Sequence, residues 1–552
     1  MRGVRLSQKL IDEFVSQGYW NDTTMVDIFE KNALEYPDKE AVVDSKTRLS
    51  WSQIKQRADR LALGFLELGI KRDQIILVQL PNIVDAYVLQ VAFRKAGIVN
   101  AQVIPVFRHK EVEFVLNFVE AVGVVIPWQY SNQEHFQMIQ DIKPKLPKLK
   151  HIFVVGDEAP SETISIRDLY QQPLERKYPP DYLDKFKVEP FDTSIILLTS
   201  GTTRIPKMIE WSEQTCICGG KGILEKVKAT GEDTFGGIMP MSGASGYLSI
   251  WLAPPQVAAK TALLDVWEPG AALKLIEKER ITTLIAAPPQ MEKMLRHPNF
   301  DKTKLSSLRA IRSGGGPLKP ALGVELEQKI GCKMAISSGT TESGVLGSTA
   351  ADDLDDIRLY TLGRPITGME LKVVDDAGKE LSPGEPGDLL ARGCAAGSGY
   401  YKDPEATKEA WGTLGKDGWF HTGDIATLDQ GGNLKIVGRK KDMILRGGQN
   451  IFPKDIEDTL RKHPKISDAA VVAMPDTVMG EKACAYITPK PKQQLSFEEM
   501  VSFLKERGLS TYALPERLEI LDSLPTVTYT GKVDKKALRE DIANKLRAEG
   551  KI

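Results

Sequence analysis

The chain has few cysteines and few histidines, and these shortages exclude two kinds of protein. Its 552 residues contain five cysteines, too few for a secreted domain framed by disulfides. Cys216 and Cys218 form a C-x-C pair, but no second pair lies beside it and the six histidines are scattered, so no zinc site is expected. We expect ordinary thiols in a reducing cytoplasm.

The chain also lacks an excess of charge of one sign and lacks a long apolar run. Lys and Arg number 73 and Asp and Glu number 74, so the formal net charge is −1 and no chain-wide cationic field exists to bind nucleic acid. The first twenty residues carry acids and no continuous apolar stretch, so we expect no signal peptide there. No run approaches the roughly 18 apolar residues that a membrane span needs. We therefore expect a cytoplasmic protein with no nucleic-acid partner and no membrane span.

What the sequence does have is a repeated alternation of strand-like and helix-like segments. Apolar runs typical of buried strands occupy 75–80, 98–106 and 122–128, and segments with helical periodicity, 83–97 and 111–121, lie between them. Further segments of both kinds follow, at 194–200, 261–266, 271–280 and 282–289. Strand–helix–strand units at this spacing favour a parallel α/β sheet.

The pattern changes twice towards the C-terminus. After about residue 355 turn signals become dense, and 420–439 is expected to form a hairpin around Gln-Gly-Gly-Asn, in a small antiparallel sheet or barrel. From 442 to 476 we expect a strand, a glycine turn, a helix and a strand, followed by helices at 497–508 and 535–550 and a strand at 518–525. The predicted fold is α/β: a large N-terminal domain of βαβ subdomains with a small antiparallel β subdomain, 1–440, and a small mobile α+β domain, 441–552.

Two loops combine the residue types that a nucleotide needs. In LLTSGTTRIPK (197–207), hydroxyl groups, glycine and Lys207 follow a strand, which suits a phosphate cradle, although a Ser- and Thr-rich surface turn has the same composition. In SSGTTESG (337–344), Glu342 stands among hydroxyls and glycines, as a Mg²⁺ site beside phosphates requires. The alternative for the second loop is a helix start capped by Thr340 or Thr341.

Two later motifs contain charged residues that could contact a nucleotide. His-Thr-Gly-Asp, 421–424, faces Arg439 across the predicted hairpin, so this carboxylate and guanidinium could hold a ribose and a phosphate, or form only a structural ion pair. In TYTGKVDKKALR (528–539), Lys532 is a cation that follows Gly531 and precedes a basic helix; the alternative is a solvated surface lysine.

In this order and spacing, the motifs resemble the adenylate-forming superfamily of acyl-CoA synthetases, peptide-synthetase adenylation domains and luciferases. The resemblance covers essentially the whole chain and includes GY-YKDPEAT (399–407), GWFHTGD, GRKKDMI and GGQNIFPKDIE. Within the superfamily, VQLPNIVDAY, RKAGIV and GKVDKKALRE resemble aryl-acid AMP ligases of the 2,3-dihydroxybenzoate type.

The resemblance implies roles for individual residues. Lys532, Thr341 and Glu342 would be catalytic, with Glu342 also binding Mg²⁺, and Lys441 would be the hinge between the domains. The implied ATP-binding residues are Thr199, Ser200, Gly201, Thr202, Thr203, Lys207, Gly315, Gly316, Pro317, Ser338, Gly339, Thr340, Asp424 and Arg439. The implied acid pocket consists of Ser242, Gly243, Ala244 and Gly316, and Gly447 and Gly448 would line the channel for the pantetheine arm of coenzyme A.

The chain departs from the pattern of this superfamily at three places. Arg204 stands in the phosphate loop where glycine is usual, and Ser338 replaces an aromatic residue that stacks on adenine. Gly243 and Ala244 occupy the positions of a His-Asn pair that dihydroxybenzoate ligases offer to their acid. We expect a larger or less hydroxylated acid: a substituted aromatic, alicyclic or medium-chain acyl substrate.

The predicted function is an ATP-dependent, AMP-forming carboxylic acid–CoA ligase, with ATP, Mg²⁺ and coenzyme A as cofactors and co-substrate. The Asn-Ile-x-Pro sequence at 450–453 favours this interpretation because the resemblance associates it with acyl-CoA ligases. One alternative is an aryl-acid–AMP ligase that loads the phosphopantetheine of a carrier protein. Another is a catalytically silent homologue that binds nucleotide or acyl-adenylate. A homodimer is one arrangement that the resemblance allows.

Overall fold

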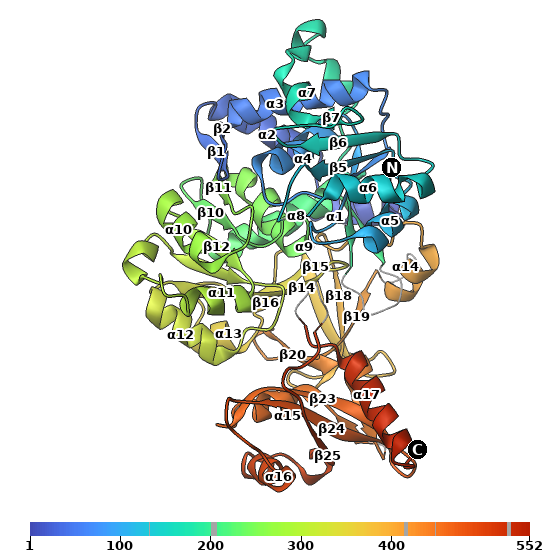
Figure 1. Cartoon of the computed structure of the whole chain (residues 1–552), viewed down its shortest axis with the longest axis vertical. Coiled ribbons are helices and arrows are strands. Elements are labelled where there is room, and N and C mark those ends of the chain that lie inside the picture. The colour runs from blue at the N-terminus through green and yellow to red at the C-terminus, as the bar shows by residue number, and fades with distance from the viewer. Residues whose placement is uncertain (132, 200–206, 413–417, 448, 527–531) are drawn as a thin grey trace. The chain divides into compact units, whose positions relative to one another are not determined.

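The computed structural model describes every residue except 132, 200–206, 413–417, 448 and 527–531 (Figure 1). Two compact units make up the chain. The first contains Met1–Leu371 and Ala391–Phe420, and the second contains Lys372–Leu390 and His421–Ile552.

The first unit holds a seven-stranded sheet in the order β7-β6-β5-β3-β4-β8-β9. Its strands are β3 (Ile75–Val78), β4 (Val99–Gln102), β5 (Gly123–Pro127), β6 (His151–Val155), β7 (Ile164–Ser165), β8 (Thr193–Leu198) and β9 (Met208–Ser212). Neighbouring strands are parallel except β8 and β9, which form an antiparallel hairpin. Helices α5 (His109–Phe118) and α6 (His135–Ile142) pack on this sheet through a shared apolar cluster.

A nine-stranded sheet follows in the same unit, in the order β16-β15-β14-β13-β12-β10-β11-β1-β2. Its strands are β1 (Glu40–Val43), β2 (Arg48–Ser50), β10 (Thr234–Gly237), β11 (Lys260–Leu263), β12 (Thr283–Ala286), β13 (Ala310–Ser313), β14 (Lys333–Thr340), β15 (Gly344–Ser348) and β16 (Arg364–Pro365). The central pairs are parallel and the edge pairs antiparallel. Helices α10 (Pro269–Glu279), α11 (Pro288–Leu295) and α12 (Pro320–Ile330) cover it (Figure 1).

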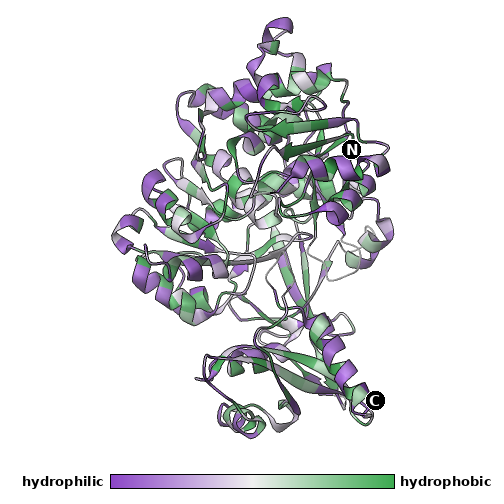
Figure 2. Cartoon of the chain, in the orientation of Figure 1, coloured by the Kyte–Doolittle hydropathy of each residue, from purple (hydrophilic) through white to green (hydrophobic). Residues whose placement is uncertain are grey.

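Two helices of this unit are buried along most of their length. Every residue of α4 (Val84–Lys95) is buried, and α8 (Glu213–Val227) contacts both β9 of one sheet and β15 of the other. Besides short 3-10 helices, this unit also contains α1 (Gln8–Ser16), α2 (Met25–Glu35), α3 (Trp51–Glu67), α7 (Ile166–Gln171), α9 (Ala244–Gly246), the π-helix η4 (Tyr247–Leu252), α13 (Asp355–Tyr360) and α14 (Pro404–Ala410). Apolar residues concentrate in the strands, and hydrophilic residues lie on the outer helices (Figure 2).

A four-stranded sheet consists of β17 (Met369–Val374), β18 (Gly387–Gly393), β19 (Phe420–Leu428) and β20 (Leu434–Arg439). Further along the second unit, a five-stranded sheet consists of β21 (Ile444–Arg446), β22 (Gln449–Ile451), β23 (Ile466–Asp476), β24 (Gly480–Pro489) and β25 (Arg517–Ile520). Its helices are α15 (Pro453–Leu460), α16 (Phe497–Glu506) and α17 (Lys535–Ala548).

The structure confirms the predicted α/β fold, with a larger N-terminal and a smaller C-terminal part, and it corrects two local expectations. The segment 337–344 is a β-hairpin and not a helix start, so the capping alternative for Thr340 and Thr341 is wrong. The segment 442–476 contains one strand more than expected, because β22 pairs with β21 before α15 begins. None of the helices in the described part of the chain combines the length and the apolar character needed to cross a bilayer.

Candidate active site

The two ends of the first predicted phosphate loop are joined by a backbone hydrogen bond. Strands β8 and β9 are antiparallel with Leu198 opposite Met208, and the Thr199 N–H donates to the Lys207 carbonyl at 2.9 Å. Thr199 and Lys207 therefore stand at the two ends of a hairpin loop. Ser200, Gly201, Thr202, Thr203 and Arg204, which the sequence assigns to this loop, lie outside the described residues.

The second predicted loop is the tight turn between β14 and β15. Thr340 pairs with Gly344, and the Ser343 N–H donates to Thr340 Oγ1 at 3.1 Å, so the turn is fixed by its own side chains. A Cβ on Gly339 would lie 2.1 Å from the Gly344 carbonyl oxygen, which leaves room only for glycine there. The turn presents Thr341 and Glu342 at its tip.

Tyr400 links the two loops. Its hydroxyl donates to Glu342 Oε1 at 3.1 Å, and the Lys207 ammonium lies 4.6 Å from the centroid of its ring. Burial, together with the negative charge of Glu342, raises the pKa of Tyr400, so its hydroxyl stays a donor at neutral pH. Trp211 Nε1 donates to the Thr341 carbonyl at 2.8 Å. Lys207, Thr341 and Glu342 therefore share one site, and sequence reasoning missed the tyrosine that joins them.

The glycine loop after β13 meets the predicted acid-pocket segment. A Cβ on Gly314 would lie 3.0 Å from Ser245 Oγ and 3.5 Å from Ser337 Oγ, so the loop that carries Gly315, Gly316 and Pro317 approaches both segments closely. Gly315 has φ +78°, a conformation that favours glycine. Ser242, Gly243 and Ala244 lead into α9, Ser338 and Gly339 follow Ser337, and Ser242 Oγ is buried without a recorded partner among the described residues.

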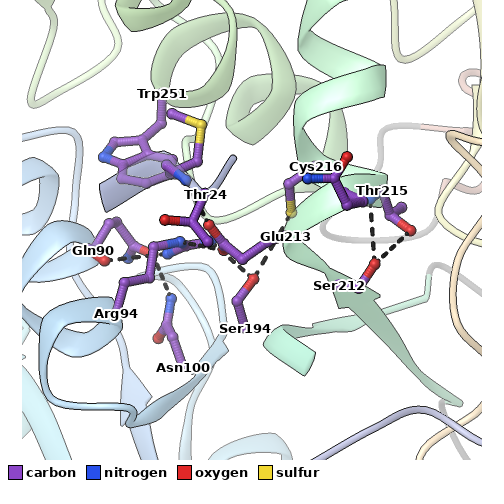
Figure 3. Close-up of polar contacts among 12 residues, drawn as sticks. Thr24, Gln90, Arg94, Asn100, Ser194, Ser212, Glu213, Thr215, Cys216 and Trp251 are labelled. Carbon is purple, nitrogen blue, oxygen red and sulfur yellow. Dashed lines mark hydrogen bonds and ion pairs between the residues drawn. The ribbon is translucent and has the colours of Figure 1, made fainter. Parts of the chain in front are cut away.

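A buried polar network reaches the π-helix that follows this pocket segment, and Figure 3 shows its residues Arg94, Glu213 and Trp251. Arg94 of α4 and Glu213 of α8 form an ion pair at 2.6 Å, with side chains 1% and 0% exposed. The guanidinium also donates to Tyr247 Oη at 2.9 Å and lies 4.5 Å from the ring centroid of Trp251. Tyr247 and Trp251 both belong to η4, so one ion pair ties α4 and α8 to the π-helix that follows the pocket segment. The sequence signal was an arginine within an apolar helix.

In the second unit, Asp424 and Arg439 are partners as predicted. They are opposite each other in the β19–β20 register, and Arg439 Nε lies 2.8 Å from Asp424 Oδ1. Burial raises the pKa of Asp424, although the nearby positive charges of Arg439 and Lys532 oppose that shift. The side chain of Asp424 is 10% exposed and that of Arg439 is 45% exposed, so the guanidinium has a face for a further partner.

Lys532 belongs to the same electrostatic cluster. Desolvation by the surrounding protein, followed by the positive charge of Arg439, lowers the pKa of Lys532, although its side chain keeps an exposed face. Lys441 lies in a short 3-10 helix between β20 and β21, and its charge acts on both Asp424 and Lys532. Gly447 has φ +55°, and Gly448 lies outside the described residues.

The described residues hold no group of three or more His, Cys, Asp and Glu side chains that could bind a metal by themselves. Glu342 fits a different kind of site, because Mg²⁺ is commonly held by one or two carboxylates together with substrate phosphates. The residue is partly exposed, and among the described residues its Oε2 atom accepts no hydrogen bond beside the Tyr400 contact to Oε1.

Comparison with known proteins identifies the family. The family model for AMP-binding enzymes matches residues 29–401, and the model for the AMP-binding enzyme C-terminal domain matches residues 455–532. Together they include the loops of the first unit and Lys532, and the stretch between them includes Asp424, Arg439 and Lys441.

Relatives of two kinds match nearly the whole chain. Medium-chain fatty-acid–CoA ligase of Escherichia coli strain K12 is 33% identical, over 96% of this chain and 92% of its own. 2,3-Dihydroxybenzoate–AMP ligase of Bacillus subtilis strain 168 is 32% identical, over 98% of this chain and 97% of its own. The crystal structure of an anthranilate CoA ligase with anthranoyl-AMP has the same fold, with a TM-score of 0.83 and 24% identity over 95% of this chain and 98% of its own. The chain thus belongs to the AMP-binding enzyme family and is an AMP-forming acid ligase.

Proposed function

We propose that the protein joins a carboxylic acid to coenzyme A in two steps, with ATP consumed and AMP and pyrophosphate released. The observation that carries the proposal is the site in which Tyr400 holds Glu342 and Lys207 beside Thr341. Such a site offers a cation, a hydroxyl and a metal-binding carboxylate, the groups that a nucleotide triphosphate needs.

In the first step an oxygen of the substrate carboxylate attacks the α-phosphorus of ATP, and pyrophosphate leaves. Two anions must approach each other, so positive charge aimed at the reacting phosphorus is the main catalytic requirement. We assign this charge to Lys532 and Lys207, and the α-phosphate contact to Thr341. Glu342 would hold Mg²⁺, which neutralises phosphate charge when it is bound.

The remaining nucleotide contacts are assigned from where the implied ATP-binding residues lie in the fold. We assign the ribose to Asp424 and Arg439, whose ion pair leaves the guanidinium exposed. We assign the phosphates to the loop that begins at Thr199. We assign the adenine to two segments: the loop of Gly315, Gly316 and Pro317, and the end of β14 with Ser338, Gly339 and Thr340.

In the second step the thiol attacks the acyl carbon and AMP leaves. Lys532 is not needed for that attack, so we propose that residues 441–552 move about Lys441 between the two steps. The short helix that contains Lys441 lies in the stretch between the two family matches, which supports a boundary there. Gly447 and Gly448 would leave room for the thin pantetheine arm.

We choose coenzyme A as the acceptor because of the Asn-Ile-x-Pro segment and not because of overall similarity. The CoA-ligase relative and the AMP-ligase relative are about equally identical to this chain. The Asn-Ile-x-Pro segment forms the end of β22 and the start of α15, and in the sequence one residue separates it from the two glycines. A carrier protein bearing phosphopantetheine is the second candidate acceptor, because the aryl-acid ligase relative is of the AMP-ligase type.

The test measures pyrophosphate release for a panel of aromatic, alicyclic and medium-chain acids, with and without coenzyme A. We expect an acyl-CoA thioester to form in a one-to-one ratio with the AMP released. Consumption of the acid only when a phosphopantetheinylated carrier protein is added would replace coenzyme A by the second acceptor. Nucleotide binding without pyrophosphate release from any acid would contradict the ligase assignment.

A further inference from the structure

One buried arginine in the first unit lacks the kind of partner that buried arginines normally have. Arg312 lies on β13 with 4% of its surface exposed. Its Nη1 donates to Ser249 Oγ of η4 at 2.8 Å. Among the described residues no carboxylate pairs with it, and a neutral hydroxyl does not balance its charge.

The other buried arginines of the described chain make the contrast clear. Arg94 pairs with Glu213 at 2.6 Å, and Arg358 pairs with Glu327 at 2.6 Å and with Asp355 at 2.7 Å. Arg5 donates to two backbone carbonyl oxygens, at 2.6 and 3.0 Å. Arg312 alone among these four rests on a single hydroxyl.

The charge on Arg312 is nevertheless present at neutral pH. Burial lowers the pKa of Arg312 to about 10, which still leaves the guanidinium protonated. A buried charge without a counter-ion is unfavourable for folding, so its presence in a well-packed sheet calls for a role outside stability.

The position of the guanidinium suggests that role. A Cβ built on Gly314 would meet Arg312 Nη1 at 3.6 Å, and the same point lies 3.0 Å from Ser245 Oγ and 3.5 Å from Ser337 Oγ. These atoms come from β13, from the segment after the predicted acid pocket and from the strand that leads to Thr341. Ser242 Oγ, in the pocket segment itself, is also buried without a recorded partner among the described residues.

Among the described residues, the guanidinium bonds to η4 and not to the β14–β15 turn that carries Thr341. Arg312 is within β13, before the glycine loop, and it bonds to Ser249 of η4 rather than to the pocket segment that precedes α9. The α-phosphate contact is assigned to Thr341, at the tip of the β14–β15 turn. The far end of an acid that reaches this tip is therefore the part that can approach Arg312.

We infer that Arg312 is a specificity-determining residue that receives an oxygen acceptor, best an oxyanion, at the far end of the acid from the reacting carboxylate. The inference rests on the proposed function and narrows its substrate to acids with such a second group. A plain alkyl or phenyl end would leave the guanidinium buried without a counter-charge in the complex, and the loss of a buried polar partner is what gives sites of this kind their selectivity.

The first experiment compares matched acids by ATP–pyrophosphate exchange: octanoate with octanedioate, cyclohexanecarboxylate with cyclohexane-1,4-dicarboxylate, and benzoate with 4-carboxybenzoate. We expect the wild type to prefer the second member of at least one pair by tenfold or more in kcat/KM, with 4-methoxybenzoate testing a neutral oxygen. Arg312→Met should reverse the preference, mainly through KM, and Arg312→Lys should restore part of it.

The second measurement is thermal unfolding without substrate. Arg312→Met should unfold at the same temperature as the wild type or higher, because it removes an unbalanced buried charge. Arg358→Met, the matched control, should unfold at a lower temperature because it removes the buried guanidinium that pairs with Glu327 and Asp355 and leaves them only the more distant, exposed Lys333.

The outcomes separate the inference from the function on which it rests. If plain and substituted acids support ATP–pyrophosphate exchange equally well, and Arg312→Met does not change this, then Arg312 has no role in specificity. The ligase assignment would still hold. A large loss of stability in Arg312→Met with unchanged selectivity does the same, because it shows a structural arginine. Failure of every acid to support exchange overturns the proposed function itself, and the inference with it.

Discussion

Lys532 is the residue whose removal should separate the two half-reactions. Lys532→Ala should lower ATP–pyrophosphate exchange by about 10²–10³-fold, the scale for one charge-stabilising group. Thioester formation from supplied acyl-adenylate should change less than about threefold, because that step needs no charge at the phosphorus. Stopped assays of each half-reaction measure both rates, with Lys536→Ala as the control, since Lys536 is exposed at the start of α17, the helix that follows Lys532. Equal damage to both half-reactions would contradict the assignment.

The charge of Lys532 should also be visible in the pH profile. Desolvation and the neighbouring Arg439 lower its pKa, and the protonated form is the active one, so adenylation should fall at a pH below the usual lysine value of about 10.4. Lys532→Arg should keep the charge at higher pH and move this alkaline limb upwards, whatever its effect on the maximum rate. An alkaline limb that stays in place in Lys532→Arg would assign the titration to another group.

Residue pairs could be predicted from the sequence where a hairpin brings them together and not where the fold does. Asp424 and Arg439 were predictable because a short turn joins their strands. Tyr400 and Glu342 come from elements joined by no local pattern, so only the tertiary structure shows their hydrogen bond. Arg312 gave no signal, because an arginine within a short apolar strand does not reveal whether a carboxylate faces it.

At the scale of elements, the Arg94–Glu213 pair should determine how firmly α4, α8 and η4 hold together. Glu213→Gln removes the counter-charge of a fully buried guanidinium and should lower the free energy of unfolding by about 3–5 kcal/mol. Urea denaturation measures the loss. Glu225→Gln, in the exposed part of the same helix, should cost less than about 1 kcal/mol. If Glu213→Gln lowered the free energy of unfolding as little as Glu225→Gln does, α8 would tolerate the unpaired arginine.

The elements that were predicted well are those whose residues fit only one type of secondary structure. The strands and helices between 75 and 128 combine apolar runs with glycine or proline boundaries, and the structure has them within a few residues. The segment 337–344 was compatible with a loop and with a capped helix start, and the pairing of β14 with β15 shows that it is a hairpin turn. The π-helix η4 has no sequence signature, because its irregular hydrogen bonds are fixed by contacts with Arg94 and Thr261.

For the whole molecule, the thiols provide a test of the packing. All five cysteines are free and buried, and burial raises the pKa of Cys216 and Cys332 to about 12. A thiol-specific disulfide reagent at pH 8 should therefore react slowly with the native protein and rapidly with all five thiols after denaturation. A thiol that reacts fast in the native state would show local opening around that cysteine. The serine variant at that position identifies which thiol it is.

The boundary near Lys441 tests whether the two steps need a change in backbone conformation. Proline fixes φ near −65°, a value compatible with the 3-10 helix that holds Lys441 here, so Lys441→Pro should preserve this conformation and oppose others. If residues 441–552 move between the steps, one half-reaction should slow by more than about tenfold while the other changes little. Lys441→Ala, the control, removes the side chain without restricting φ and should leave the ratio of the two rates near that of the wild type. Equal rates of both half-reactions in Lys441→Pro and Lys441→Ala would mean that the rotation takes place about another residue.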